Sequence, residues 1–492
     1  MAAALLALFL GALDAMVMSA AMPTIVAEVG GMHLYSWVYS AYFLARAVTL
    51  PIFGKLADLY RTRNLFLAAI ALFIAASISA GASSNMGFLV SARVFQGVGS
   101  GGIFALVYIV LSDISSPQHR GRTLSFASSI WGIASVLGPT LGGFIVTYFS
   151  WRWIFFINIP LGLLSFVGIA AFSVETRPKR PSVSLDLLGV LTLAVCIVSL
   201  LTAFLWGGRR HSWLSPEVAG AVALALVAGV FFYRVERRAR DPILSLDFFA
   251  KRGFSFGNGA VFMSSFAIFS LFAFAPLFIQ GALGQSPMEV GIAMLALSFG
   301  WSLGSLVLGQ IVQRLGRKRA SMAGAVFLVT GCILTLSFSA ATTIMTCFLV
   351  FFIVGLGMGF VTLATLLVVQ SCLSASDLGV ATSSHQFSRT LGGTVGIGIC
   401  GSLVTARFSR VAENLNASVL DGGIPSAVMT RIRQNFENFF QPDVQQQLVP
   451  DLLDALHRAI GNCVIDVFWL ALIATAVCLV FGACLPPGND KG

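Results

Sequence analysis

Long apolar runs, separated by short polar breaks, occupy almost the whole chain. Each run approaches the roughly 20 residues that an α-helix needs to cross the hydrocarbon core of a bilayer. Backbone groups left unsatisfied in hydrocarbon cost several kcal/mol each, and the sequence shows no short alternating segments typical of a membrane β-barrel, so we interpret the runs as helices. The pattern predicts fourteen spans, at residues 4–26, 36–57, 64–83, 87–110, 123–147, 153–173, 187–206, 216–233, 254–280, 288–311, 320–340, 344–369, 380–405 and 460–484.

The composition agrees with residence in lipid. Hydrophobic residues make up 57% of the chain and charged residues 10%, with a mean hydropathy of +0.90, whereas a soluble domain carries about 25% charged residues. The net charge of +10 would suit a nucleic-acid partner, but Lys and Arg stand in short clusters between apolar runs. That distribution is typical of membrane topology, so we expect a lipid bilayer and no nucleic acid as partner.

The basic clusters also predict orientation. If the N-terminus is cytoplasmic, nineteen Lys and Arg residues fall on the inside and eight on the outside, while Arg46, Arg93 and Arg389 lie within spans. Cytoplasmic loops carry the excess of Lys and Arg in membrane proteins. We therefore expect a multi-pass protein of the cell's inner (plasma) membrane with both termini in the cytoplasm.

Two similar basic segments follow the second and the tenth spans. The segment from Gly54 to Arg63 has its counterpart in the segment from Gly309 to Lys318. Similar segments at corresponding positions indicate two six-helix bundles in the same orientation, with spans seven and eight inserted between them.

This repeat divides the chain into three parts. We expect an N-terminal bundle at 1–175, two inserted helices with a cytoplasmic linker at 176–252, and a C-terminal bundle at 253–492. The only long polar loop, 407–459, is expected outside. Its amphipathic stretch 428–440 predicts a short surface helix, and a loop without regular structure is the alternative.

Five motifs along the chain carry a family resemblance. Their order and spacing are similar to those of the fourteen-span drug:proton antiporters of the major facilitator superfamily, over nearly the whole chain. The resemblance implies an all-α membrane protein with the major facilitator fold and an exchange mechanism. The motifs are Leu13-Asp14 running to Met22-Pro23, Gly54 to Arg63, Arg93-Val94-Phe95-Gln96-Gly97, Gly138-Pro139-Thr140-Leu141-Gly142-Gly143, and Trp151 to Pro160.

The resemblance implies a cytoplasmic gate at the two basic segments. Glycine would let the second and third helices approach closely, and Asp58 would meet a helix N-terminus or nearby arginines. The chain departs from the family pattern at Arg61, where a glycine is usual, and at Gln313, where an acid is usual, so a latch centred on Asp58 is expected. A basic loop that only sets topology is the alternative. The gate candidates are Gly54, Asp58, Arg61, Arg63, Gly309, Gly316 and Arg317.

The fifth span carries the motif that the family associates with antiport. Small residues permit close backbone contact and proline loosens a helix. The resemblance to the family implies that Gly138, Pro139, Gly142 and Gly143 favour exchange over uptake. Generic tight packing of the helix is compatible with the same residues. The Trp151-Arg152-Trp153 cluster is expected at the membrane interface, anchoring the end of the sixth helix.

Ionisable side chains within spans are functional candidates, because they are costly in lipid unless paired or hydrated. Asp14, Arg46 and Arg93 are predicted to couple transport to protons, with Asp14 as the carrier. A permanent Asp14–Arg46 ion pair that joins two helices is the alternative. Asp466 and His385 are the secondary proton candidates.

Three side chains are candidates for the substrate cavity, namely Gln96, Gln386 and Arg389. The spans hold three arginines against Asp14 and Asp466. With so few membrane carboxylates, a neutral, zwitterionic or anionic amphiphile is as compatible with the sequence as a cationic drug.

The predicted function is therefore export of small lipophilic compounds in exchange for protons, by alternating access. A dedicated exporter or symporter of one metabolite, lipid or siderophore is the alternative. The sequence has no repeated pore loop of a channel, no nucleophile-and-base or metal-ligand constellation of an enzyme, and no phosphate-binding loop of an ATP-driven pump. We expect no metal and no cofactor other than the coupling proton, and a functional monomer.

The fourteen-span topology can be tested by labelling. Cysteines introduced at Arg240 and Lys318 should react with an impermeant thiol reagent only from inside, and one at Asp443 only from outside, because an odd number of spans separates 443 from both. Labelling of positions 240 and 443 from the same side would overturn the span count.

Overall fold

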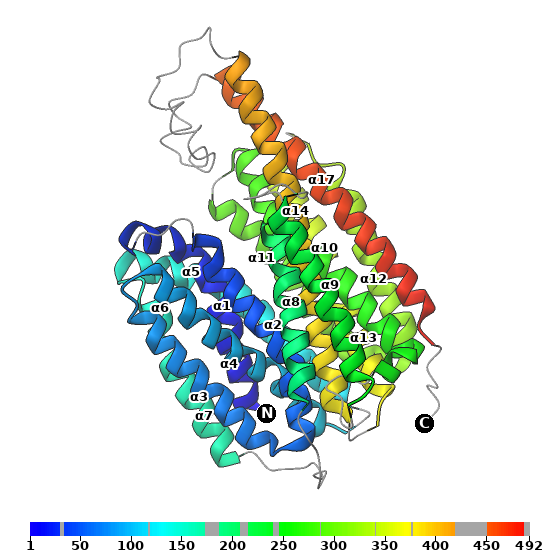
Figure 1. The fold of residues 1–492 in the computed structure, drawn as a ribbon. Helices are drawn as coiled ribbons and strands as arrows, with labels where there is room; N and C mark the ends of the chain where they lie inside the picture. Colours follow the sequence, from blue (N-terminus) through cyan, green and yellow to red (C-terminus); the bar gives the residue numbers. More distant parts are fainter. Residues whose placement is uncertain are drawn as a thin grey trace.

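The structure is a computed structural model that describes residues 1–29, 34–116, 119–172, 186–206, 215–239, 246–285, 287–339, 341–374, 377–418 and 450–486. Within these ranges the chain is helical and contains no strand. The helices stand side by side as a bundle, with the start of the first and the end of the last toward the lower end of the view (Figure 1).

Each of the fourteen predicted spans coincides with a helix or, for the sixth span, with a pair of helices. Nine of the described helices are long and apolar enough to cross a membrane, so the predicted all-α membrane fold is confirmed. The helices are α1 (Ala2–Val29), α2 (Tyr35–Leu59), α3 (Thr62–Gly81), α4 (Met86–Asp113), α5 (Arg120–Tyr148), α6 (Trp153–Phe156), α7 (Asn158–Phe172), α8 (Leu187–Trp206), α9 (Pro216–Glu236), α10 (Arg252–Gly281), α11 (Pro287–Leu315), α12 (Arg317–Thr335), α13 (Ile344–Ser371), α14 (Leu378–Ser418) and α17 (Pro450–Cys484), with a 3₁₀ helix, η2, at Leu246–Ala250.

The predicted loop 407–459 is too long, because both of its ends are helical. Helix α14 continues to Ser418 and α17 begins at Pro450. At about 1.5 Å per residue, the 41 residues of α14 cover roughly 60 Å, about twice the hydrocarbon thickness. The two helices project together from one end of the molecule (Figure 1), where Arg407 Nη2 lies 2.8 Å from Asp466 Oδ2. The predicted surface helix 428–440 lies outside the described residues.

The hydropathy pattern placed the ends of these spans at the first charged residues. A helix satisfies its own backbone hydrogen bonds whether or not its side chains are apolar, so it continues through charged residues such as Arg407. The pattern therefore located the apolar part of each helix correctly and missed its polar extension.

Buried apolar side chains form two large cores. The first is built from α1 to α7 together with residues at one end of α11, α12 and α13, and the second from α10 to α14 and α17. Helices α8 and α9 pack against each other, and α8 touches α2 and α14 through a small cluster that includes Leu44, Leu193 and Val395. The inserted pair therefore lies beside the junction of the two bundles.

Gly54 lies within α2, which contradicts its predicted role between the second and third helices. Helix α2 continues to Leu59 and the chain turns at Tyr60, which is extended. A Cβ atom placed on Gly54 would lie 1.9 Å from Ser383 Oγ and 2.9 Å from the carbonyl oxygen of Gly379, both on α14. Glycine is required here because α2 and α14 touch across the two bundles.

A hydrogen bond joins the bundles at the same end of the molecule. Gln370 Nε2, near the end of α13, donates to Ser112 Oγ, near the end of α4, at 2.8 Å. The Gly54–α14 contact and this hydrogen bond together hold the two bundles closed at that end.

The other gate candidates lie nearby, in different surroundings. Arg63 donates to the carbonyl oxygen of Ala170 in α7, which keeps it within the first bundle. Arg61 is exposed at the start of α3, and the side chain of Asp58 is outside the described set. Gly309 is buried in α11.

The second basic segment turns at Gly316. Its φ of 81° is a left-handed conformation that favours glycine, and α12 begins at the next residue, Arg317.

Replacing Gly54 by alanine should separate the bundles at this end. The added Cβ collides with α14, whereas the same change at Gly220, on α9, meets nothing within 4 Å. Both substitutions raise helix propensity by about 1 kcal/mol, so Gly220→Ala is a matched control. A cysteine pair at Ser112 and Gln370 should crosslink efficiently in the parent and in Gly220→Ala but poorly in Gly54→Ala. Equal crosslinking in all three would show that the close approach at Gly54 does not hold the bundles together.

Candidate functional site

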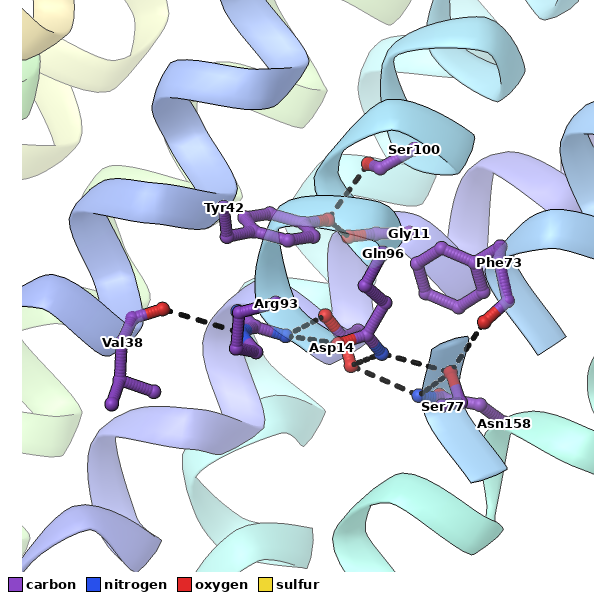
Figure 2. A network of polar contacts seen from close by, with 10 residues as sticks. All are labelled: Gly11, Asp14, Val38, Tyr42, Phe73, Ser77, Arg93, Gln96, Ser100 and Asn158. Atoms are coloured by element: carbon purple, nitrogen blue, oxygen red, sulfur yellow. Dashed lines mark hydrogen bonds and ion pairs between the residues drawn. The ribbon is translucent and has the colours of Figure 1, made fainter. Parts of the chain in front are cut away.

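A buried polar network surrounds Asp14 in the first bundle (Figure 2). Arg93 Nη1 donates to Asp14 Oδ2 at 2.7 Å and to Gln96 Oε1 at 2.8 Å. The side chains of Asp14 and Arg93 are each 1% exposed. Asp14 and Arg93 are therefore both buried, and they form a direct ion pair between α1 and α4.

Two amides and a hydroxyl complete what we call the Asp14 network, which comprises Asp14, Ser77, Arg93, Gln96 and Asn158. Gln96 Nε2 donates to Asp14 Oδ1 at 2.8 Å, and Asn158 Nδ2 donates to the same oxygen at 2.9 Å. Both amides also donate to Ser77 Oγ. The carboxylate thus accepts bonds from three side chains and is held by α1, α4 and α7, with α3 beside them.

Tyr42 connects this network to α2. Its hydroxyl donates to the carbonyl oxygen of Gly11 at 3.2 Å and lies 2.7 Å from Ser100 Oγ. The Arg93 guanidinium carbon stands 4.1 Å from the centroid of the Tyr42 ring, within range of a cation–π interaction.

Close helix packing sets this geometry. A Cβ on Gly97 would lie 2.4 Å from the carbonyl oxygen of Tyr42, so only glycine lets α4 approach α2 this closely. A Cβ on Gly138 would lie 2.4 Å from Met16 Cβ, which fixes α5 against α1 two residues beyond Asp14. The glycines of two sequence motifs therefore act by bringing helices together around the carboxylate.

Arg46 is outside the Asp14 network, so the alternative of a permanent Asp14–Arg46 ion pair is wrong. Its guanidinium carbon lies 3.6 Å from the centroid of Phe104 and 5.4 Å from that of Trp131. The Asp14 carboxylate is bonded instead to Arg93, Gln96 and Asn158. The side chain of α2 that reaches the network is Tyr42, one turn before Arg46.

A second polar and aromatic group lies where α2, α4, α5, α11 and α14 meet, and we call it the central cluster. Trp131 and Trp301 stack across the two bundles with ring centroids 6.3 Å apart and planes 8° apart. The Arg389 guanidinium carbon lies 4.9 Å from the first ring and 5.1 Å from the second. The cluster consists of Arg46, Phe104, Trp131, Trp301, Gln386 and Arg389.

The substrate candidates divide between the two sites. Gln386 Oε1 accepts a hydrogen bond from Arg389 Nη1 at 3.3 Å, so these two share the central cluster. Gln96 belongs to the Asp14 network.

The secondary proton candidates lie elsewhere. His385 Nε2 is 2.9 Å from Thr365 Oγ1 inside the second bundle. Asp466 pairs with Arg407, and both side chains are partly exposed.

The glycine- and proline-containing motif of the fifth predicted span lies in a single helix, since Gly138, Pro139, Gly142 and Gly143 all fall within α5. Gly138 makes the contact with α1 described above, and Gly142 is buried. This placement agrees with a packing role for these two glycines.

Trp151, part of the cluster predicted at the membrane interface, is buried within the protein. The side chain is 1% exposed, and its Nε1 donates to Glu28 Oε2 at 2.8 Å. Arg152 forms an ion pair with the same carboxylate and stacks 4.4 Å from the Trp151 ring. Trp153 is the exposed member of the cluster. The acid at the end of α1 draws Trp151 inward, a long-range pairing that local sequence does not reveal.

Several site residues were not singled out from sequence. Ser77 and Asn158 are neutral polar residues in apolar runs, and Asn158 falls in a quoted motif whose aromatic residues are more conspicuous. Tyr42, Trp131 and Trp301 are aromatic residues among many in the spans. A search for uncharged hydrogen-bonding groups within spans would have found Ser77 and Asn158.

Comparison with known proteins settles the family. A family model of the Major Facilitator Superfamily matches residues 4–397. The chain belongs to the major facilitator superfamily. The family inferred from the motifs is thus confirmed, and the chain is a multi-pass membrane transporter.

Two bacterial relatives and one fungal relative of this major facilitator protein illustrate the likeness. The multidrug transporter protein MdtP of Bacillus subtilis (strain 168) is 34% identical over 507 residues, covering 98% of this chain and 92% of the relative. Multidrug resistance protein 3 of the same strain is 29% identical, covering 97% and 92%. The efflux pump FUS6 of Gibberella fujikuroi is 29% identical, covering 91% and 83%.

Solved structures show the major facilitator fold. The human organic anion transporter MFSD10 superposes with a TM-score of 0.63 at 13% identity, covering 96% of this chain and 98% of that one. The proton:xylose symporter XylE gives the same TM-score at 12% identity, covering 99% and 96%. At these identities the likeness concerns the fold alone.

The Glu28–Arg152 pair predicts a pH-dependent contribution to stability. Hydrogen bonding from Arg152, and then from Trp151, lowers the pKa of Glu28 below its ordinary value of 4.5. Glu28 lies just beyond the predicted span 4–26. A carboxyl group whose pKa is lowered by folding stabilises the folded state at pH values above its ordinary pKa. That contribution disappears as the pH falls through the lowered pKa.

Melting curves can test this contribution. Glu28→Gln should melt slightly below the parent at pH 7, and the difference should shrink as pH falls below 4.5. A difference that is constant with pH would mean that the carboxylate charge does not contribute.

Proposed function

We propose that this transporter exports small lipophilic compounds in exchange for protons, as a monomer in the plasma membrane with both termini cytoplasmic. The observation that carries the proposal is the fully buried Asp14 carboxylate paired with the equally buried Arg93. Ionisable groups in this position are expensive and typically mark ion pathways. The names of the bacterial relatives, multidrug transporter and multidrug resistance protein, support drug efflux.

The contacts around Asp14 describe its ionised form. All three side chains bonded to the carboxylate donate hydrogen, which suits an anion with no proton of its own. A proton on Asp14 would remove the negative charge opposite Arg93 and turn one acceptor oxygen into a donor. Protonation would therefore break the ion pair and release Arg93 from α1.

Release of Arg93 would be transmitted to α2. Arg93 Nε donates to the carbonyl oxygen of Val38 at 3.3 Å, and its guanidinium covers Tyr42, so α4 holds α2 through the same side chain that holds Asp14. Helix α2 in turn contacts α14 at Gly54. In our proposal, the proton on Asp14 changes the position of α2 and thereby the contact between the bundles.

Alternating access requires the closed end to open. The described contacts at that end include the Gly54–α14 approach, the Ser112–Gln370 hydrogen bond, and apolar packing of α11, α12 and α13 against the first bundle. A single neutral hydrogen bond contributes about 1 kcal/mol, so the Ser112–Gln370 bond is weak enough to be exchanged during a cycle. We propose that Asp58, Arg61, Arg63, Gly309, Gly316 and Arg317 form the remainder of this cytoplasmic gate.

The driving force is sufficient for concentrative export. About 100 mV supplies about 2.3 kcal/mol for each elementary charge moved, and each pH unit adds about 1.4 kcal/mol. Together they could sustain a substrate gradient of several hundred-fold for each proton exchanged, because every 1.4 kcal/mol is about tenfold.

The alternative is a dedicated exporter or symporter of one metabolite, lipid or siderophore. The observation that favours a narrower substrate range is the central cluster, whose two buried arginines favour anionic over cationic compounds. Arg389 and Gln386 are the proposed substrate contacts in either case, with Gln96 serving the Asp14 network.

The Asp14→Asn variant tests the proton carrier. Asparagine retains the shape of the protonated acid, so the variant should fold and bind substrate but lose transport driven by a pH gradient. If Asp14 is only a structural link, removing one partner of a buried ion pair should cost about 3–5 kcal/mol of stability. Melting temperature and proton-driven efflux from proteoliposomes should be measured on the same preparation.

Asn158→Ala is the matched control. It removes one hydrogen bond to Asp14 while leaving the titratable group in place. Asn158→Ala should retain pH-driven transport. A stable Asp14→Asn protein that still accumulates substrate under a pH gradient alone would exclude Asp14 as the carrier and direct attention to Asp466 and His385.

A further inference from the structure

The central cluster contains an excess of unpartnered hydrogen-bond donors. Arg46 Nε and Nη1, Arg389 Nη2, Gln386 Nε2 and Trp301 Nε1 are buried and make no hydrogen bond to the described residues. Arg46 and Arg389 are 3% and 2% exposed, and Gln386 is 1% exposed. Unsatisfied buried donors are costly and rare in folded proteins. A group rich in acceptor atoms would satisfy all of them.

The cluster also carries uncompensated positive charge. No carboxylate among the residues placed in the structure forms an ion pair with Arg46 or Arg389, and the buried acid Asp14 is bonded to Arg93. Both guanidinium carbons lie within 5.4 Å of the centroid of one ring, that of Trp131. Two like charges this close repel each other, and the repulsion is stronger in a medium of low dielectric constant than in water.

The aromatic residues of the central cluster indicate which kind of chemical group the ligand would carry beside its acceptor atoms. Trp131 belongs to the first bundle and Trp301 to the second, and their nearly parallel rings are part of the contact between α5 and α11. A planar ring of a ligand could stack on either indole when the bundles separate. Offset stacking between aromatic rings is favourable beyond the burial of area.

We propose that the central cluster is the binding site for the anionic group of an aromatic amphiphile, a carboxylate or sulfonate attached to a planar ring system. Arg46 and Arg389 bind the anion from the two bundles, Gln386 and Trp301 donate further hydrogen bonds, and the indoles cover the ring. The proposal names the substrate class of the exporter proposed above and rests on that function.

This arrangement gives the ligand a part in the transport cycle. An anion bonded to both arginines joins α2 of one bundle to α14 of the other, whereas the empty cluster places two positive charges opposite each other. A bound anion therefore favours the closed arrangement of these helices, and its loss favours their separation.

A purely structural role for the arginines makes the opposite prediction for stability. Each guanidinium stacks on aromatic rings, at 3.6 Å from Phe104 for Arg46 and at 4.9 Å from Trp131 for Arg389. If these contacts serve to hold the fold, replacing either arginine by glutamine should lower the melting temperature. If the arginines serve to bind a ligand, replacing one of them removes an uncompensated buried charge. The melting temperature of the ligand-free protein should then stay unchanged or rise.

Equilibrium binding to the full chain tests the proposal. Protein in phosphatidylcholine nanodiscs, without anionic lipid and without a pH gradient, is titrated with 2-naphthoate, 2-naphthamide, 2-naphthylmethylammonium and acetate. Binding is followed by isothermal calorimetry. We expect 2-naphthoate to bind at least about tenfold more tightly than the other three, a preference equal to about one charge-assisted hydrogen bond.

Variants locate the site. Arg46→Gln and Arg389→Gln should each abolish the preference for naphthoate over naphthamide, and the lysine variants should retain part of it because they keep the charge. Arg237→Gln is the control, since Arg237 is an exposed cation placed over the Tyr233 ring at 5.2 Å, and it should leave binding unchanged.

Three results would overturn the proposal. They are absence of naphthoate binding up to 10 mM, equal or tighter binding of the ammonium compound or of acetate, and a marked fall in melting temperature in both glutamine variants. Because the measurement uses no proton gradient, its outcome is independent of the Asp14→Asn transport test. Either proposal can fail while the other stands.

Discussion

The buried ion pair between Asp14 and Arg93 is the interaction on which the first bundle depends. Placing two charges in a low-dielectric interior is favourable only when their mutual attraction and additional hydrogen bonds repay the loss of hydration. The structure supplies those bonds from Gln96 and Asn158, and it positions them through helix contacts as close as that of Gly97 with Tyr42. Four helices are therefore arranged around one carboxylate.

The two polar regions of the molecule differ in how completely their groups are paired. In the Asp14 network the carboxylate accepts three hydrogen bonds from side chains of its own bundle. In the central cluster the donors outnumber their acceptors and face across two bundles. A paired group can be changed by a proton, whereas an unpaired one can be satisfied by a ligand. This difference is a physical reason to assign the proton to Asp14 and the substrate to Arg46 and Arg389.

The sequence predicted the helices far better than their partners. Hydropathy is a property of each segment alone, so each of the fourteen predicted spans coincides with a helix or a helix pair, and the predicted thirteenth span was shorter than α14 because charged residues interrupted the pattern. The Asp14–Arg46 pair was wrong because pairing depends on the rotation of each helix about its axis. Close contacts such as that between Gly97 and α2 set this rotation. The burial of Trp151 was not foreseen for a similar reason, since its partner Glu28 lies more than a hundred residues away.

One face of α2 links the two sites. Val38, Tyr42, Arg46 and Thr49 recur every three or four residues, the spacing of a single stripe on a helix. Along this stripe, the Val38 carbonyl oxygen accepts from Arg93, and Tyr42 lies beneath the Arg93 guanidinium. Arg46 then stacks on Phe104.

The stripe continues at Thr49, which fits against Gly101 so closely that a Cβ there would lie 2.0 Å from Thr49 Oγ1. Helix α2 therefore cannot slide or turn against α4 without altering the surroundings of the Asp14 network and of the central cluster together. If a proton and a substrate each favour a different position of this helix, each must change the affinity for the other by the same factor, because the coupling free energy is shared. The close packing of α2 on α4 provides a direct physical route for that coupling.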